Sequence, residues 1–330
     1  MKIAKSNIVT TIKVILAIIL FSYIFFFYLD YNKLSSSISE VNYLLFLSIV
    51  PLGFLIRILN AYQTKILLEP FGIKYSSYHI FKVNHIAMFY SMFLPGDLAG
   101  GAVTWHYLSR DSGMRAQVAT VIVLVRVINL ISLIPFAVLG FYYEPRIVQL
   151  GYQNYIILFG ILSFSMIIPF FSTTTAYFFE NLFFIFIKLF PYRKIRPRLV
   201  EANTNFWNSV RFCKSFPKQI VSNFIFGISM IFIANITTLV SFISVGVNLS
   251  LFIYFWVNSF NAIVLYLPIN LFGIGGVALS AVLIYNNFYD VTTDKIILAL
   301  TISYIFNLIF PLLGAYYNAT LKSKKETNDK

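Results

Sequence analysis

The chain has 330 residues, of which 59% are hydrophobic and only 11% are charged, and its mean hydropathy is +0.79. A soluble domain of this size cannot bury so much apolar surface, so the composition excludes a soluble enzyme or binding module. The net charge of +13 is typical of membrane proteins whose loops face an anionic inner leaflet, and we expect no nucleic-acid partner. The single cysteine, Cys213, excludes an internal disulfide framework and fits no metal-ligand spacing.

Apolar runs of roughly 20 residues, the length needed to cross about 30 Å of hydrocarbon, recur along the whole chain. They predict membrane helices at residues 9–29, 43–61, 116–142, 154–172, 223–245, 249–267 and 296–317. The first run follows a charged start but is long and lacks a small-residue cleavage site, so we expect it to be retained. Two shorter apolar pieces, 79–93 and 271–286, lie beside glycine-rich breaks. The sequence therefore predicts an all-α integral membrane protein with about seven to eight transmembrane helices.

Lysine and arginine set the predicted orientation. Residues 188–218 carry eight basic residues against one acid, Glu201, so we expect this segment to be cytoplasmic, together with both termini. Residues 30–40, 144–153 and 289–295 have no basic excess and should face outward. We therefore expect a multi-pass protein of the cytoplasmic membrane.

Two stretches rich in proline and glycine interrupt the apolar pattern, FLPGDLAGG at 93–101 and YLPINLFGIGG at 266–276. The predicted orientation requires the chain to enter and leave on one side at the first stretch, and on the opposite side at the second. Broken backbone in hydrocarbon is tolerated only where protein or a wet cavity satisfies its polar groups. We therefore expect two re-entrant hairpins, inverted relative to each other, around a midplane site. Two hairpins that merely pack against the bundle are the alternative.

We expect one membrane domain over residues 1–322, with pseudo-repeats at about 1–172 and 173–322. Within it, residues 173–222 should form an interfacial cytoplasmic segment, with Phe and Leu toward the membrane and Lys and Arg toward anionic inner-leaflet headgroups. Residues 323–330 should form a basic cytoplasmic tail.

Arg126 is the most informative single charge. It lies about 10 residues, or ~15 Å, into its predicted helix, where an arginine costs roughly 2.5 to 3.5 kcal/mol. It therefore needs a partner or a wet cavity. Asn129 lies three residues on, on the same helix face, and Asp97 is a candidate counter-ion. A guanidinium fork for a lipid phosphate and a structural ion pair both fit this pattern.

The other polar groups in apolar segments give weaker signals. Arg57 lies near the inner end of its predicted helix, and we expect its side chain to snorkel. Asn258 and Asn261 share a helix face that could line a pathway, although such side chains usually link helices. No metal-ligand spacing joins the three histidines, His79, His85 and His106.

The stretches LPGDLAGGAVTWHYLSR, ATVIVLVRVINLISL and LPINLFGIGGVALSAVL resemble the membrane region of lysylphosphatidylglycerol synthases and its stand-alone relatives. The resemblance covers roughly residues 10–320. It implies a flippase-like fold of about eight helices with re-entrant elements, which moves an anionic or lipid-linked substrate between leaflets. We expect no soluble aminoacyl-transferase domain and therefore no aminoacyl-lipid synthesis.

Several positions match the family pattern, namely Pro95, Gly96, Gly100, Gly101, Arg126, Pro268, Gly273 and Gly275. Other positions depart from it. Val125 and Asn129 stand where the family often has acidic residues around its buried arginine, and Gly101 and Thr104 stand where it often has an acid and an arginine. The glutamate common after the late glycines is missing from 277–280. These departures leave the identity of the substrate open.

We therefore predict a flippase-like transporter for a membrane phospholipid or polyprenyl-linked lipid, which needs no cofactor or metal and could form a homo-oligomer. The predicted substrate-binding residues are Pro95, Gly96, Asp97, Gly100, Gly101, His106, Arg126, Asn129, Asn258, Asn261, Pro268, Gly273 and Gly275. No H-E-x-x-H, G-x-S-x-G or Walker sequence occurs, so we do not expect an enzyme. One alternative is a lipid-modifying membrane enzyme that uses Asp97 and His106 as an acid/base pair. Another is a non-transporting partner of a cell-envelope glycosylation complex.

Overall fold

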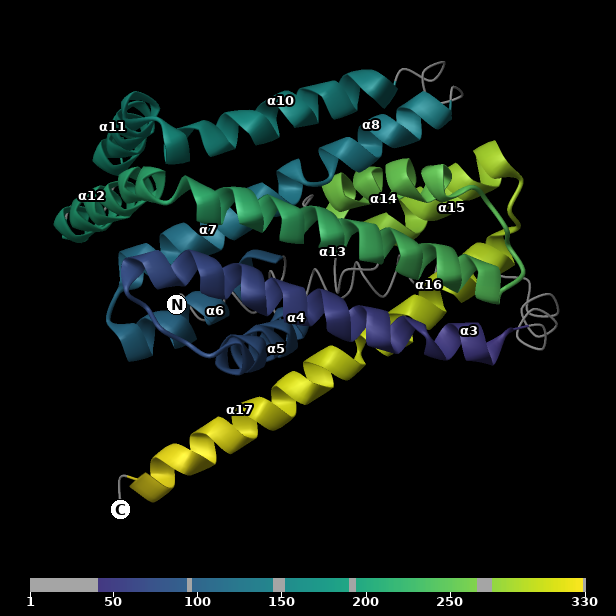
Figure 1. The fold of residues 1–330 in the computed structure, drawn as a ribbon, viewed down its shortest axis with the longest axis horizontal. Helices are drawn as coiled ribbons and strands as arrows, with labels where there is room; N and C mark the ends of the chain where they lie inside the picture. Colours follow the sequence, from purple (N-terminus) through teal and green to yellow (C-terminus); the bar gives the residue numbers. More distant parts are fainter. Residues whose placement is uncertain (1–40, 94–96, 145–151, 190–193, 266–274, 329–330) are drawn as a thin grey trace.

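The computed structural model describes residues 41–93, 97–144, 152–189, 194–265 and 275–328 (Figure 1). Every regular element in these ranges is a helix, which confirms the predicted all-α class. The first predicted span and the tips of both predicted hairpins lie outside the described residues.

The helices form three groups along the chain. The first group contains α3 (Tyr43–Leu47), α4 (Ile49–Leu68), the 3-10 turn η1 (Glu69–Phe71), α5 (Ser77–Phe93), α6 (Asp97–Ser112), α7 (Arg115–Ile131) and α8 (Ile134–Tyr143). The second contains α10 (Tyr152–Phe171), α11 (Thr173–Leu189), α12 (Arg196–Phe212) and η2 (Cys213–Ser215). The third contains α13 (Pro217–Ser244), α14 (Leu251–Leu265), α15 (Gly275–Tyr289), α16 (Thr293–Asn307) and α17 (Ile309–Asn328).

Four described stretches are long and apolar enough to cross a membrane, namely Tyr43–Phe71, Arg115–Tyr143, Pro217–Ser244 and Thr293–Thr320. A fifth span exists if α10 and α11, which are bent by 107° at their junction, count as one. The predicted span at 249–267 is described as far as Leu265, as the 15 residues of α14, and this described part is shorter than the ~20 residues that a crossing needs. The described residues thus contain four to five spans where hydropathy predicted six.

The bend between α10 and α11 has a local cause. Pro169 lies inside α10 and cannot donate a backbone hydrogen bond. Ser172 follows, and its hydroxyl accepts from the Thr175 backbone N–H at 3.4 Å, which caps the start of a new helix.

The long helices α4 and α13 run antiparallel. At one end, the Asn42 backbone N–H donates to the Ser244 carbonyl at 2.8 Å. Farther along, the Gln63 amide donates to the Asn223 carbonyl at 3.2 Å. The chain therefore leaves α4 at one end of the bundle and leaves α13 at the opposite end.

Helices α5 and α6 form a hairpin that starts at the Leu68 end of α4. The Tyr75 hydroxyl, just before α5, donates to the Leu108 carbonyl near the end of α6 at 2.9 Å. At the joined end, Gly100 lies against Ser91, because a Cβ built on the glycine would be 2.6 Å from the serine Oγ. The two helices are therefore antiparallel neighbours.

Helices α14 and α15 form a second hairpin, which starts at the Ser244 end of α13. The Trp256 indole N–H donates to the Tyr289 hydroxyl at 2.9 Å, and the Ser280 hydroxyl donates to the Asn261 carbonyl oxygen at 2.6 Å. Figure 1 shows α5 and α6 toward the end that carries α11 and α12, with α14 and α15 toward the other end. The two hairpins therefore begin at opposite ends of the bundle.

Each hairpin is tied to its long helix by a pair of asparagines. Asn84 of α5 donates to Asn60 of α4 at 2.8 Å. Asn258 of α14 donates to Asn235 of α13 at 2.9 Å. Both pairs join a long helix to the middle of the first hairpin helix. We call α4 to α8 the first unit and α13 to α17 the second unit, and this bond is present in both units.

A shared sequence follows each hairpin. Both α7–α8 and α16–α17 contain Asn-Leu-Ile, then a proline, then Leu-Gly-x-Tyr-Tyr, at residues 129–143 and 307–317. In both, the helix is interrupted just before the proline, which is Pro135 or Pro311. The spacings differ by two residues on each side of the proline, so the repeat has no fixed sequence period.

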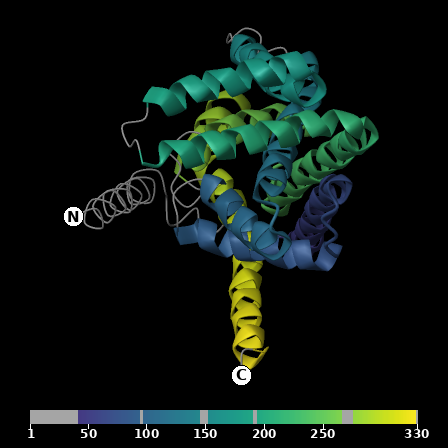
Figure 2. The same cartoon turned by 90° about the vertical axis from the view of Figure 1, so that its left-hand side faces the viewer.

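The glycine of this repeat marks a close helix crossing in each unit. A Cβ at Gly140 of α8 would lie 2.6 Å from the Trp256 Cβ of α14. A Cβ at Gly314 of α17 would collide with the His85 carbonyl of α5. The last helix of each unit therefore packs on the hairpin of the other unit, while the C-terminal part of α17 projects from the bundle (Figures 1 and 2).

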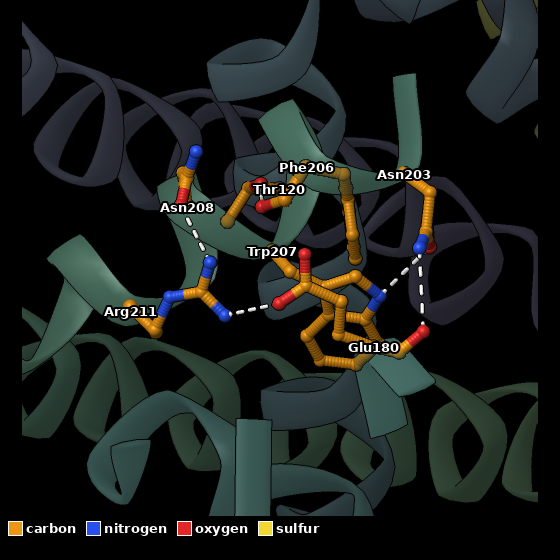
Figure 3. A network of polar contacts seen from close by, with 7 residues as sticks. All are labelled: Thr120, Glu180, Asn203, Phe206, Trp207, Asn208 and Arg211. Atoms are coloured by element: carbon orange, nitrogen blue, oxygen red, sulfur yellow. Dashed lines mark hydrogen bonds and ion pairs between the residues drawn. The ribbon is translucent and has the colours of Figure 1, made fainter. Parts of the chain in front are cut away.

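Helices α11 and α12 are joined side by side through polar contacts (Figure 3). The Arg211 guanidinium donates to the Glu180 carboxylate and to the Asn208 amide oxygen. The Asn203 amide donates to the Glu180 backbone carbonyl at 3.3 Å and accepts from the Trp207 indole at 3.0 Å. The outer side of α11 exposes several large apolar side chains, which are Tyr177, Phe178, Phe183, Ile185, Phe186 and Leu189.

Candidate functional site

A cavity of about 330 Å³ lies between α4, α5, α6 and α7. The polar residues that line it are Arg57, Asn60, Thr64, Asn84, Ser91, Thr104, Arg126 and Asn129. Among the described lining residues, the two arginines are the charged ones, and no carboxylate is present. The described cavity wall is therefore basic and rich in amide groups.

Arg126 occupies the wall formed by α7, where the adjoining Val125 and Val127 are buried. Its guanidinium lies directly against the backbone of Gly101 in the first half of α6. A Cβ built at Gly101 would be 2.6 Å from Arg126 Nη2 and 3.0 Å from Cζ. Only glycine allows the guanidinium to lie this close to the α6 backbone.

Arg57 lines the same cavity, and the prediction that it snorkels at a helix end is wrong. Helix α4 continues to Leu68, so Arg57 lies midway along the Tyr43–Phe71 stretch rather than near its end. Its Nη2 donates to the Asn307 amide oxygen at 3.3 Å, and its Cζ lies 4.6 Å from the centre of the Phe310 ring. Both contacts come from the second unit of the fold.

The amide groups of the cavity are partly paired. The Asn60 oxygen accepts from Asn84 at 2.8 Å, and the Asn129 oxygen accepts from the fully buried Gln63 at 2.9 Å. These bonds use the carbonyl oxygens of Asn60 and Asn129 and leave their amide N–H groups as further donors. Arginine and amide donors on one wall suit an anionic ligand.

The structure brings four predicted site residues together at this cavity, which are Gly100, Gly101, Arg126 and Asn129. His106 of α6 is exposed and does not line it. Asn258 and Asn261 belong to the second hairpin, where they bond to α13 and α15 respectively. Each therefore links helices, and neither lines the cavity.

The remaining predicted site residues fall at the hairpin tips. Pro95, Gly96, Pro268 and Gly273 lie outside the described residues. Asp97 and Gly275 are the first residues of α6 and α15, and the surroundings of these two residues also lie outside the described part. The pairing of Asp97 with Arg126 and the approach of the two tips therefore stay predictions.

Sequence reasoning missed Arg57, Asn60 and Asn84. A signal for the first two was present, because Arg57, Asn60 and Thr64 follow an i, i+3, i+7 pattern on one face of an apolar helix. No such signal exists for Asn84, since its partner Asn60 lies 24 positions away in the sequence.

A larger hollow of about 680 Å³ lies beside η1 and α12 and includes Arg115, Asn205 and Asn208. Arg115 is exposed and lies at the first residue of α7, so its charge carries little desolvation cost there. The cavity at Arg126 is the stronger candidate because its two arginines lie within membrane spans, where a charge needs a partner.

Together, the helical bundle and this basic cavity define a multi-pass membrane protein with a candidate anion site inside it. Residues 12–315 match the family of the lysylphosphatidylglycerol synthase TM region, and the chain belongs to that family. Searches of the curated proteins and of the solved structures find no significant match.

Proposed function

We propose that the protein is a flippase-like transporter that moves an anionic lipid headgroup between the two faces of the cytoplasmic membrane. The observation that carries this proposal is the cavity inside the bundle, whose charged described lining residues are Arg57 and Arg126. A guanidinium inside a membrane span is costly unless water or an anion reaches it. A lipid phosphate supplies such an anion.

The arrangement of the helices supports an inverted repeat. Helices α4 to α8 and α13 to α17 share a long helix, a hairpin, an asparagine pair and the interrupted span with Leu-Gly-x-Tyr-Tyr. Units of this kind with broken helices near the midplane are typical of alternating-access transporters. We propose these two units as the repeats, each within the predicted boundaries 1–172 and 173–322, and both hairpins as re-entrant.

The close crossings couple the two proposed repeats. Gly140 places α8 on the second hairpin, and Gly314 places α17 on the first. A movement of one hairpin would therefore displace the last helix of the other repeat, which is α8 or α17. We propose that this reciprocal packing allows the cavity to open to one side of the membrane at a time.

We further propose that the end carrying α11 and α12 is cytoplasmic, with the exposed apolar side of α11 resting on the membrane. A cysteine placed at Asn205 should then react with a membrane-impermeant thiol reagent from the cytoplasmic side, and one at Thr292 from the outside. Both native residues are exposed. Labelling of position 292 from the cytoplasmic side alone would contradict the proposed orientation of the second hairpin.

Native Cys213 should not interfere with this labelling. It is fully buried, and burial raises the pKa of its thiol to about 12. Because the thiolate is the reactive form, we expect no labelling of the folded protein at pH 7 and complete labelling after denaturation. Rapid labelling of the folded wild type would show that this region opens.

Reconstitution tests the proposed function directly. Purified protein is placed in vesicles with a headgroup-labelled anionic phospholipid, and label access to an impermeant quencher is followed over time. A transporter should speed the exchange of label between leaflets without changing the lipid chemically. A chemically altered lipid would favour the alternative of a lipid-modifying enzyme. If the protein neither speeds the exchange of label nor alters the lipid, the alternative of a non-transporting partner in a glycosylation complex is favoured.

A further inference from the structure

We propose that Gln63 is a positioning residue, which turns the amide NH2 group of Asn129 toward the cavity, so that this wall donates to a phosphate oxygen. Gln63 lies on α4 and Asn129 on α7. The inference rests on the proposed function, since it names the atoms that the transported headgroup presents at Asn129. Binding at this position and transport can be measured separately.

The backbone carbonyl of Asn223 in α13 sets the direction of the Gln63 amide. The Gln63 Nε2 atom donates to this carbonyl oxygen at 3.2 Å. A backbone carbonyl accepts hydrogen bonds and cannot donate, so the end of the Gln63 amide that faces it must be the NH2 group. The same nitrogen donates to Asn129 Oδ1 at 2.9 Å. Both hydrogens of the Gln63 amide are therefore used, one toward α13 and one toward α7.

The contact with Gln63 in turn sets the direction of the Asn129 amide. The end of Asn129 that meets a donor must be its carbonyl oxygen. This oxygen also lies 3.4 Å from the Cβ position of Gly227 in α13, and α13 contributes none of the described cavity residues. Asn129 lines the cavity, whereas Gln63 does not. The part of Asn129 that remains for a ligand is therefore its NH2 group, which is a donor.

The burial of Gln63 shows that packing alone does not account for an amide at this position. Gln63 is fully buried within the Tyr43–Phe71 stretch, which is long and apolar enough to cross a membrane. Its Oε1 atom has no hydrogen-bond partner among the described residues, and a buried polar atom without a partner is unfavourable. An apolar side chain would avoid this cost. The contact with Asn129 offsets it.

A donor at Asn129 favours a ligand atom that accepts. Phosphate oxygens are such acceptors, and hydrogen bonds to a charged acceptor are stronger than those between neutral groups. An ammonium group offers donors alone, so it would not pair with the Asn129 NH2 group. We therefore expect the phosphate of a lipid headgroup to lie at Asn129, and not an amine.

The test measures binding to the full-length protein in detergent at pH 7.5 and constant ionic strength. The probes are dihexanoyl phosphatidylglycerol, which carries a lipid phosphate, inorganic phosphate, and uncharged dihexanoylglycerol. We expect dihexanoyl phosphatidylglycerol to bind about tenfold or more tightly than dihexanoylglycerol, because it presents phosphate oxygens. Inorganic phosphate distinguishes a free anion from a headgroup and should bind more weakly than the lipid probe.

Variants of Gln63 separate the donor from the volume of the side chain. Gln63→Met keeps a long unbranched side chain but removes both donors, so Asn129 can rotate. We expect the affinity for dihexanoyl phosphatidylglycerol to fall about three- to tenfold, with unchanged affinity for dihexanoylglycerol. Thermal unfolding should change little, since the lost hydrogen bonds are offset by removal of the unpaired Oε1 atom. Gln63→His supplies one N–H donor at a similar reach and should keep part of the phosphate affinity.

A double-mutant cycle tests whether Gln63 acts through Asn129. Asn129→Leu removes the amide that meets the ligand and should weaken binding of dihexanoyl phosphatidylglycerol about tenfold. Adding Gln63→Met to Asn129→Leu should then cause no further loss. If the two residues contributed independently, their separate losses would multiply in the double variant.

Asn258→Leu provides a matched control. Like Gln63, Asn258 donates twice through its amide nitrogen, to Asn235 at 2.9 Å and to Thr238 at 3.0 Å. Neither of these acceptors lines the cavity, in contrast to Asn129. We expect Asn258→Leu to leave the affinity for dihexanoyl phosphatidylglycerol unchanged.

Four results would overturn the inference. They are no binding of either phosphate probe by the folded wild type, wild-type affinity in folded Gln63→Met, no higher affinity in folded Gln63→His than in Gln63→Met, and losses that multiply in the double variant. Tighter binding of inorganic phosphate than of the lipid probe would overturn the headgroup as the ligand. If the variants bind as expected but labelled lipid does not exchange between leaflets, the proposed function fails while this inference stands.

Discussion

Replacing Arg126 with alanine should reduce lipid exchange between leaflets about 100-fold or more, to the rate of vesicles without protein. The guanidinium lies directly against the α6 backbone at Gly101, and its removal would take away one of the two guanidinium groups among the described cavity residues. Initial exchange rates at equal protein density measure the effect. The surface variant Arg115→Ala, at the start of the same helix, should retain the wild-type rate.

Arg126→Lys distinguishes geometry from charge. A lysine carries the charge but cannot form two parallel N–H bonds to a phosphate, so we expect little recovery of the exchange rate. Gly101→Ala should act in the same direction, because its methyl group would displace the guanidinium. Full activity of both variants would show that the precise position of the guanidinium does not matter.

Gly314→Ala should lower the free energy of unfolding by about 3 kcal/mol or more. Its methyl group would meet the His85 carbonyl, and a backbone atom cannot rotate away as a side chain can. Chemical unfolding in detergent measures the loss. Gly140→Ala, which faces the Trp256 backbone and Cβ, should produce a similar loss at the other crossing.

Gly160→Ala is the control for these crossings. It is also in a helix, but the nearest atom to its Cβ position is Ile134 Cδ1 at 3.8 Å, which is an ordinary contact distance. Alanine also favours the helix by up to about 1 kcal/mol over glycine. We expect unchanged or slightly raised stability. Equal stability of the Gly160 and Gly314 variants would contradict the close packing of α17 on α5.

The sequence predicted the all-α class and the long spans because a bilayer requires continuous apolar helices. It could not distinguish α14, whose described part has 15 residues, from a full span, since the apolar pattern of this hairpin helix resembles that of a span. The sequence also predicted too early an end for the helix that contains Arg57. The continuous apolar run ends near Tyr62, whereas α4 packs against α13 and continues to Leu68.

The candidate site was predictable only where one residue carried its own signal. Arg126 stands out as a charge in an apolar run, and Gly100 and Gly101 mark a close backbone approach. The i, i+3, i+7 pattern of Arg57, Asn60 and Thr64 marks a polar helix face but does not identify what that face contacts. The partners of Asn84 and Arg57, which are Asn60 and Asn307, lie far away in the sequence, and these contacts form only when the helices pack.

The most direct test of the proposed transport is whether one cavity residue is accessible from both sides of the membrane. Ser91 lines the cavity and accepts a near-isosteric change to cysteine, while Ser259 is buried in the second hairpin and provides a control. In sealed, oriented vesicles, an impermeant thiol reagent should modify Ser91→Cys from either side, and a short-chain lipid phosphate should slow the reaction. Ser259→Cys should remain unmodified. Modification of Ser91→Cys from one side only, with and without lipid, would contradict an alternating cavity.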